Sequence, residues 1–151
     1  MADEESSEFH TLKGYRLQEG DEITESMEDY LEMLCRHMLD KGYMRVSALA
    51  EQLNVRPSSA SKMVGKLKEL ELVRFEKYGL ITLTDRGYEI GRYLLWRHEV
   101  LSRFFFLLNG SEGELRQVER VEHFMDRDTI ENLERLMGRV EKEGFRWEIG
   151  R

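Results

Sequence analysis

Apolar residues after Thr24 recur at intervals of three and four, which is the spacing of one face of an α-helix. Either Thr24 or Ser26 can act as the N-cap, acidic residues fill the first turn, and Lys41-Gly42 forms a stop signal. We therefore expect an amphipathic helix from about Thr24 to Lys41. Its apolar stripe comprises Met27, Tyr30, Leu31, Leu34 and Met38.

The next segment predicts two helices joined by a tight turn. The first helix covers Val46–Leu53, and the turn is Asn54-Val55-Arg56. Pro57 then stands in the first turn of a second helix that runs to Leu70, where its missing N–H costs nothing. Two short helices around a tight turn are typical of a helix-turn-helix.

A β-hairpin and a long helix follow. The segments 72–76 and 80–83 are compatible with strands, and Lys77-Tyr78-Gly79 joins them as a hairpin. Thr84 caps a helix that extends from about Asp85 to Leu108 before Asn109-Gly110 ends it. Two further helical patterns complete the chain, at residues 112–125 and 128–143, the second capped by Asp126 or Asp128.

These elements predict a mainly α protein with three parts. Residues 1–22, rich in acidic residues, read as a flexible tail, and residues 23–84 form a winged helix-turn-helix domain with a small β-hairpin wing. Residues 85–151 form a helical domain. Its helix at 93–108 is apolar on more than one face, so we expect a second copy of the chain to cover part of it, unless the chain itself buries that face.

Charge is unevenly distributed along the chain. The 151 residues carry 23 basic and 30 acidic side chains, a net charge of -7, yet residues 41–79 carry 8 basic against 4 acidic ones. A basic segment within an acidic protein suits a polyanion such as DNA, although ordinary surface variation gives similar patterns. A lone Cys35, the lack of a signal-like apolar run near the N-terminus and the charges that interrupt the 93–108 stretch favour a cytoplasmic protein that does not enter a membrane.

Small polar and basic residues occupy the outer face of the second helix of the helix-turn-helix. Small serines allow a helix to approach base edges, lysines reach phosphates or guanine acceptors, and basic or aromatic residues at the wing contact the backbone or the minor groove. The alternative is a helix-turn-helix that serves only as a protein contact. The candidate DNA-binding residues are Arg56, Pro57, Ser58, Ser59, Ser61, Lys62, Lys66, Arg74, Lys77 and Tyr78.

Acidic and histidine residues recur at helical spacing in three separate segments. Asp29 and Glu32 are three residues apart, Glu119, Glu122 and His123 stand at i, i+3 and i+4, and His98 lies on the long helix. Spacings of three and four place side chains on one helical face, so each set can point at one place. Each set alone is a weak signal, and Asp29 with Glu32, like a solitary His98, is more often part of a solvated surface than a metal ligand.

Several blocks together resemble the diphtheria toxin repressor family, in its manganese-responsive branch. They are Ser26-Met-Glu-Asp-Tyr-Leu-Glu32, the run from Arg45 to Val64, Trp96-Arg-His-Glu99 and Val118-Glu-Arg-Val-Glu-His123. These blocks occur in the same order as in the family, and the resemblance extends from about Ser26 to Glu143. It implies a winged-helix domain, a helical dimerisation domain and two divalent ions bound between them.

The resemblance also implies the ligand set: Asp29, Glu32, His98, Glu119, Glu122 and His123. Iron-type relatives have sulfur-bearing residues where this chain has Asp29 and Glu119, which favours manganese. Phe124 departs from the family pattern, which often has a second histidine there. Four carboxylates at one site repel one another, and two divalent ions offset their charge, so a binuclear site with Glu32 or Glu122 bridging is the economical arrangement. Donors without Cys favour Mn²⁺, while Fe²⁺ and other divalent ions remain possible.

The residues and the resemblance together predict a metal-dependent DNA-binding repressor of metal uptake genes that acts as a homodimer on an operator and is not an enzyme. One rival is a winged-helix regulator that responds to iron or to an organic ligand in the dimer domain. A second rival is a metal-dependent hydrolase, which the absence of a further nucleophile and of a Gly-rich phosphate loop argues against.

Overall fold

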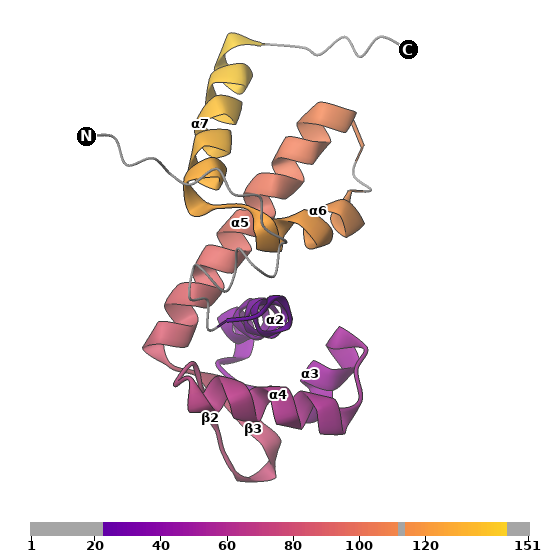
Figure 1. Cartoon of the computed structure of the whole chain (residues 1–151), viewed down its shortest axis with the longest axis vertical. Helices are drawn as coiled ribbons and strands as arrows, with labels where there is room; N and C mark the ends of the chain where they lie inside the picture. The colour runs from indigo at the N-terminus through magenta and orange to yellow at the C-terminus, as the bar shows by residue number, and fades with distance from the viewer. Residues whose placement is uncertain (1–22, 112–113, 145–151) are drawn as a thin grey trace, which may run out of the picture.

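The computed structural model describes residues 23–111 and 114–144, which form two helical lobes joined by one long helix (Figure 1). That helix, α5, covers Asp85–Asn109 and takes part in both lobes. The structure is mainly helical with one small sheet, as the sequence predicts. The predicted flexible tail at 1–22 lies outside the described residues. In the ranges that are described, no helix is long and apolar enough to cross a membrane.

Helix α2 (Glu25–Lys41) begins and ends where the sequence signals predict. Thr24, rather than Ser26, is the N-cap, and its Oγ1 accepts a hydrogen bond from the Met27 backbone N–H at 3.3 Å. Gly42 ends the helix with φ 75°, in the left-handed region that glycine adopts without strain. Asp29 and Glu32 therefore lie within the regular part of α2, one helical turn apart.

The winged helix consists of β1 (Met44–Arg45), α3 (Val46–Leu53), α4 (Pro57–Glu69), β2 (Val73–Phe75) and β3 (Leu80–Leu83). The strands form an antiparallel sheet in the order β1-β3-β2, with Ile81 paired to both Met44 and Phe75. Strand β1 was not predicted. The loop between β2 and β3 is a short 3-10 turn over Lys77–Gly79.

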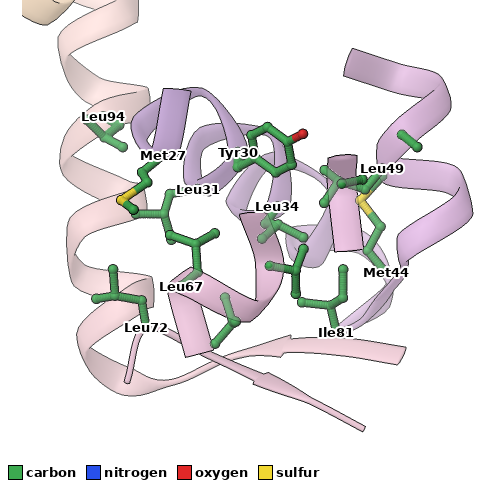
Figure 2. Close-up of a cluster of buried hydrophobic side chains, with 14 residues drawn as sticks. Met27, Tyr30, Leu31, Leu34, Met44, Leu49, Leu67, Leu72, Ile81 and Leu94 are labelled. Carbon is green, nitrogen blue, oxygen red and sulfur yellow. The ribbon is translucent and has the colours of Figure 1, made fainter. Parts of the chain in front are cut away.

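The first core lies between α2, the winged helix and the start of α5 (Figure 2). Leu31 and Leu34 of α2 are fully buried, and Leu67 and Leu72 meet them from α4 and the segment before β2. Burial of such side chains stabilises the fold by roughly 1.5–3 kcal/mol each. The α2 stripe predicted from the sequence is therefore the face that packs, although Met38 at its end is only partly buried.

The second lobe contains α6 (Leu115–Val121), a 3-10 turn η2 (Glu122–Phe124) and α7 (Arg127–Glu143). The prediction of one continuous helix over 112–125 was wrong: α6 ends at Val121, and Glu122–Phe124 tightens into η2. Asp126 is the residue that precedes α7, as one of the two predicted caps. The second core comprises Val100, Leu101, Phe105, Val118, Ile130 and Met137.

An apolar groove of about 480 Å³ runs between α5 and α7. Phe104, Leu107 and Leu108 from α5 line it, opposite Leu136 of α7, whose side chain is 53% exposed. The single chain thus leaves part of the apolar perimeter of α5 open, as the sequence predicts.

Two glycines of α5 allow close approach of other elements. A Cβ at Gly91 would lie 2.7 Å from the Cβ of Cys35 on α2, and one at Gly87 would lie 1.9 Å from the Leu72 carbonyl oxygen. Side chains cannot occupy such distances, so α2 packs this closely on α5 only because residue 91 is glycine, and Gly87 admits the backbone of Leu72 in the same way. This contact sets the spacing of the elements that carry the acidic residues.

We predict that Gly91→Ala lowers the free energy of unfolding by roughly 1–3 kcal/mol, because the added methyl group overpacks the α2–α5 contact. Gly65→Ala on α4 is the matched control, since a Cβ there meets nothing within 4 Å. The control should gain roughly 0.5–1 kcal/mol from helix propensity. Urea denaturation at a fixed protein concentration measures both, and equal stability changes in the two variants would contradict the packing argument.

Candidate metal centre

A cleft of about 520 Å³ lies where α2, α5 and the α6–η2 segment meet. Asp29 and Glu32 enter it from α2, and His98 enters from α5. Glu119 and Glu122 line its third side. One cavity therefore contains acidic and histidine residues that lie far apart in the sequence. Their spacing in the sequence alone could not show that these segments meet.

Two groups of candidate ligand atoms lie in or beside this cleft. Asp29, Glu122 and His123 form the first group, and Glu32, His98 and Glu122 form the second. In each group one ligand atom per residue lies within 4.8 Å of the others. Glu122 belongs to both groups, so of the two residues considered for bridging it is the one that reaches both positions.

The two histidines present different ring nitrogens to the carboxylates. Nδ1 of His98 lies 3.0 Å from Oε2 of Glu122 and 3.4 Å from Oε1 of Glu32. Nε2 of His123 lies 3.1 Å from Oδ1 of Asp29 and 4.0 Å from Oε1 of Glu122. Imidazole and carboxylate donors at these separations suit a divalent transition metal.

Glu119 differs from the other five predicted ligands. It lines the cleft from α6, but its side chain is exposed and it belongs to neither group of clustered ligand atoms. Phe124, the position that departs from the family pattern, lies 46% exposed with its ring edge-on to His123, at a centroid distance of 6.5 Å. Five of the six predicted residues are thus brought together around two positions.

Burial makes the negative charge of the cleft costly. Glu122 is 1% exposed, and its Oε1 has no hydrogen-bond partner among the described residues. Burial and the charge of Glu122 raise the pKa of Glu32 above its ordinary value. A buried carboxylate oxygen without a partner is unfavourable unless a cation is close to it, so the donor set fits a metal ion.

In the metal-free protein, the carboxylates of the cleft favour the protonated form of the two histidines. The hydrogen bond that His98 Nδ1 donates to Glu122 raises the pKa of His98 above its ordinary value, against the effect of burial. Burial lowers the pKa of His123, but hydrogen bonds with Asp29 and Glu28 outweigh it and raise that pKa to about 9. The carboxylates therefore attract cationic partners even without a metal ion.

Two residues of the junction were missed by the sequence analysis. Arg97 on α5 is 4% exposed and donates a hydrogen bond from Nη2 to Oε2 of Glu28 on α2. Nδ1 of His123 lies 3.2 Å from the same oxygen. Glu28 and Arg97 adjoin Asp29 and His98 in sequence, which is the only signal that could have indicated them.

The candidate DNA-binding residues lie on the surface of the winged helix. On α4 the apolar residues Ala60, Val64 and Leu67 are buried, which leaves the serine and lysine residues outside. Tyr78 at the wing is 92% exposed and has φ 70°. Only Ser61 is half-buried; the exposed members are Arg56, Pro57, Ser58, Ser59, Lys62, Lys66, Arg74, Lys77 and Tyr78.

Two family models cover most of the chain. Residues 22–81 match the N-terminal DNA binding domain of the iron dependent repressors, and residues 84–146 match their metal binding and dimerisation domain. The chain belongs to the iron dependent repressor family. As a member of this family it is a DNA-binding, metal-dependent transcriptional regulator and not an enzyme, which confirms the prediction from the sequence.

Relatives of this family include proteins named for manganese. The chain is 44% identical over 111 residues to the HTH-type transcriptional regulator MntR of Geobacillus kaustophilus (strain HTA426), which covers 73% of this chain and 79% of the relative. The solved structure of the manganese regulator SloR is 25% identical, with a TM-score of 0.64, and covers 74% of this chain. A structure titled manganese-dependent transcriptional repressor complex with manganese is 26% identical, with a TM-score of 0.64 and 74% coverage.

The crystal structure of IdeR from T. acidophilum shares the fold, with 24% identity, a TM-score of 0.64 and 83% coverage of this chain. The chain spans about half the length of these solved relatives: 56% of IdeR, 53% of SloR and 52% of the manganese complex. The winged-helix fold with a helical second domain is thereby confirmed for the part that is shared.

We predict that Glu122→Gln weakens Mn²⁺ binding by more than roughly 100-fold, beyond the effect of a typical outer-shell partner, because Glu122 belongs to both groups of candidate ligands. Glu119→Gln is the matched control, since Glu119 lines the same cleft but belongs to neither group. Calorimetric titration with Mn²⁺ measures both variants. A greater loss in Glu119→Gln would show that the ligands are assembled differently.

Proposed function

We propose that this protein is a manganese-responsive repressor that acts in the cytoplasm on genes of metal uptake. The observation that carries the proposal is that Glu122 from the second lobe lies in two groups of ligand atoms with acidic residues of α2. The oxygen and imidazole donors, without sulfur, favour Mn²⁺ over softer ions. The name of the MntR relative, which is 44% identical, supports the same metal.

The proposed centre is binuclear and lies between two proposed domains, 23–84 and 85–151. Asp29, Glu122 and His123 would hold one ion, and Glu32, His98 and Glu122 would hold the other, with Glu119 available from the wall of the cleft. Two divalent ions supply the positive charge that offsets the carboxylates at this junction. Asp29 and Glu32 can then stay beside Glu122 without repulsion, which holds α2 against the second lobe.

The orientation of α2 bears directly on DNA binding. Leu31 and Leu34 of α2 pack in the same core as Val64 and Leu67 of α4, so the position of α4 follows that of α2. In a homodimer formed through the apolar groove between α5 and α7, this sets the distance between the two copies of α4. DNA half-sites roughly 34 Å apart accept only a narrow range of such distances.

Residues on α4 and the wing make the proposed DNA contacts. Ser58, Ser59 and Ser61 approach base edges in the major groove, together with Arg56 and Pro57 at the start of the helix. Lys62 and Lys66 reach phosphates or guanine acceptors, and Arg74, Lys77 and Tyr78 contact DNA beside the groove.

We predict that Mn²⁺ raises the affinity for operator DNA by roughly 5–150-fold, the range of typical allosteric coupling. An operator selected from random duplexes with Mn²⁺ present serves as the probe, and mobility shifts with Mn²⁺, with Fe²⁺ and with chelator measure the response. Equal operator affinity in chelator would contradict the proposal. A response to Fe²⁺ that exceeds the response to Mn²⁺ would assign the protein to iron instead.

Two variants separate metal sensing from DNA contact in the same experiment. Glu122→Gln should abolish the Mn²⁺ response, whereas an organic-ligand regulator would keep its DNA affinity unchanged by the substitution. Lys62→Gln should weaken DNA binding while Mn²⁺ binding, measured separately, stays at the wild-type level, because Lys62 is exposed on α4 and does not line the cleft.

A further inference from the structure

We propose that Glu28 and Arg97 are positioning residues for His123: they hold its ring so that Nε2 faces the candidate metal position formed with Asp29 and Glu122. The proposal deepens the proposed metal-responsive function and rests on it. It adds two residues outside the predicted ligand set, and it concerns one of the two candidate metal positions only.

The two ring nitrogens of His123 have different neighbours. Nδ1 lies 3.2 Å from Oε2 of Glu28, and Nε2 lies 3.1 Å from Oδ1 of Asp29 on the opposite side of the ring. A neutral imidazole carries one N–H and one lone pair. With Nδ1–H donating to Glu28, the lone pair is on Nε2, where a metal ion shared with Asp29 and Glu122 requires it.

Arg97 makes Glu28 a partner for the histidine and not a ligand itself. Arg97 Nη2 donates to the same Oε2 of Glu28 that faces His123. The guanidinium is buried, at 4% exposure, and neutralises the Glu28 carboxylate next to four other acidic side chains. Glu28 accordingly belongs to neither group of clustered ligand atoms, although it adjoins Asp29 in the chain.

The other candidate position has no equivalent arrangement. His98 meets Glu122 and Glu32 through Nδ1, and in the described ranges its Nε2 has no carboxylate within ion-pair distance. The ring of His98 is therefore oriented by the ligand carboxylates themselves. Loss of Glu28 should lower the metal affinity of the position that contains His123 and leave the metal affinity of the position that contains His98 almost unchanged.

The test compares Glu28→Ala, Glu28→Gln and Glu141→Gln with the wild-type protein. Glu141 of α7 is the matched control because its carboxylate also pairs with an arginine of α5. Nη2 of Arg103 lies 3.0 Å from Oε1 of Glu141, and neither residue lines the cleft. Mn²⁺ titration by calorimetry measures the affinity of each ion. Co²⁺ titration followed by visible absorption reports the ligand geometry, which a general loss of stability does not alter in a folded protein.

Glu28→Ala should lower the affinity for one of the two Mn²⁺ ions by roughly 10–100-fold, the usual cost of removing an outer-shell partner of a ligating histidine. It should also change the Co²⁺ spectrum of that ion. Glu28→Gln keeps an oxygen that accepts from His123 and Arg97 but loses the charge that strengthens both hydrogen bonds, so it should show a smaller but measurable loss at the same position. If Glu28→Ala does not fold, as judged by circular dichroism, a smaller loss at one position in Glu28→Gln supports the proposal, and wild-type affinity in Glu28→Gln overturns it.

Failure of this proposal is distinct from failure of the proposed function. Two bound Mn²⁺ ions and an unchanged Co²⁺ spectrum in folded Glu28→Ala would overturn the positioning role and leave the metal-responsive function intact. An equal loss at both positions, or an equal loss in Glu141→Gln, would overturn it as well. Absence of Mn²⁺ and Co²⁺ binding by the wild-type protein would overturn both.

Discussion

Mutual repulsion of carboxylates at the junction of two lobes constrains the whole structure. Glu122 is buried with an oxygen that lacks a hydrogen-bond partner in the described part of the chain, and acidic residues of α2 face it across the cleft. In the protein alone, protonated imidazoles offset some of this charge, and the pKa of His123 is raised to about 9. Divalent cations are the natural partners of such a cluster, which links metal to the relative position of the lobes.

Packing connects this cluster to the surface that we propose contacts DNA. Gly91 lets α2 approach α5 closely, so the cleft is built on a tight helix pair. The opposite face of α2 shares a core with α4, whose outer face carries the serine and lysine residues proposed to contact DNA. The proposed metal centre and the proposed DNA-contacting face therefore lie on one packed unit.

Most helices could be predicted from the sequence because their apolar periodicity is strong and their caps are explicit, as at Thr24 and Gly42. Strand β1 was missed because two residues carry no periodic signal. The 3-10 turn at Glu122–Phe124 was read as helix, since the two differ only in hydrogen-bond spacing, yet this turn carries two of the clustered residues.

The candidate ligands were separate weak patterns until the resemblance joined them, and five of the six share the two groups. Glu28 and Arg97 escaped prediction because their contact joins residues 69 positions apart. Anomalous diffraction from crystals grown with Mn²⁺ tests the central claim most directly. We expect two peaks, one among Asp29, Glu122 and His123 and one among Glu32, His98 and Glu122; a cleft without either peak would contradict the binuclear centre.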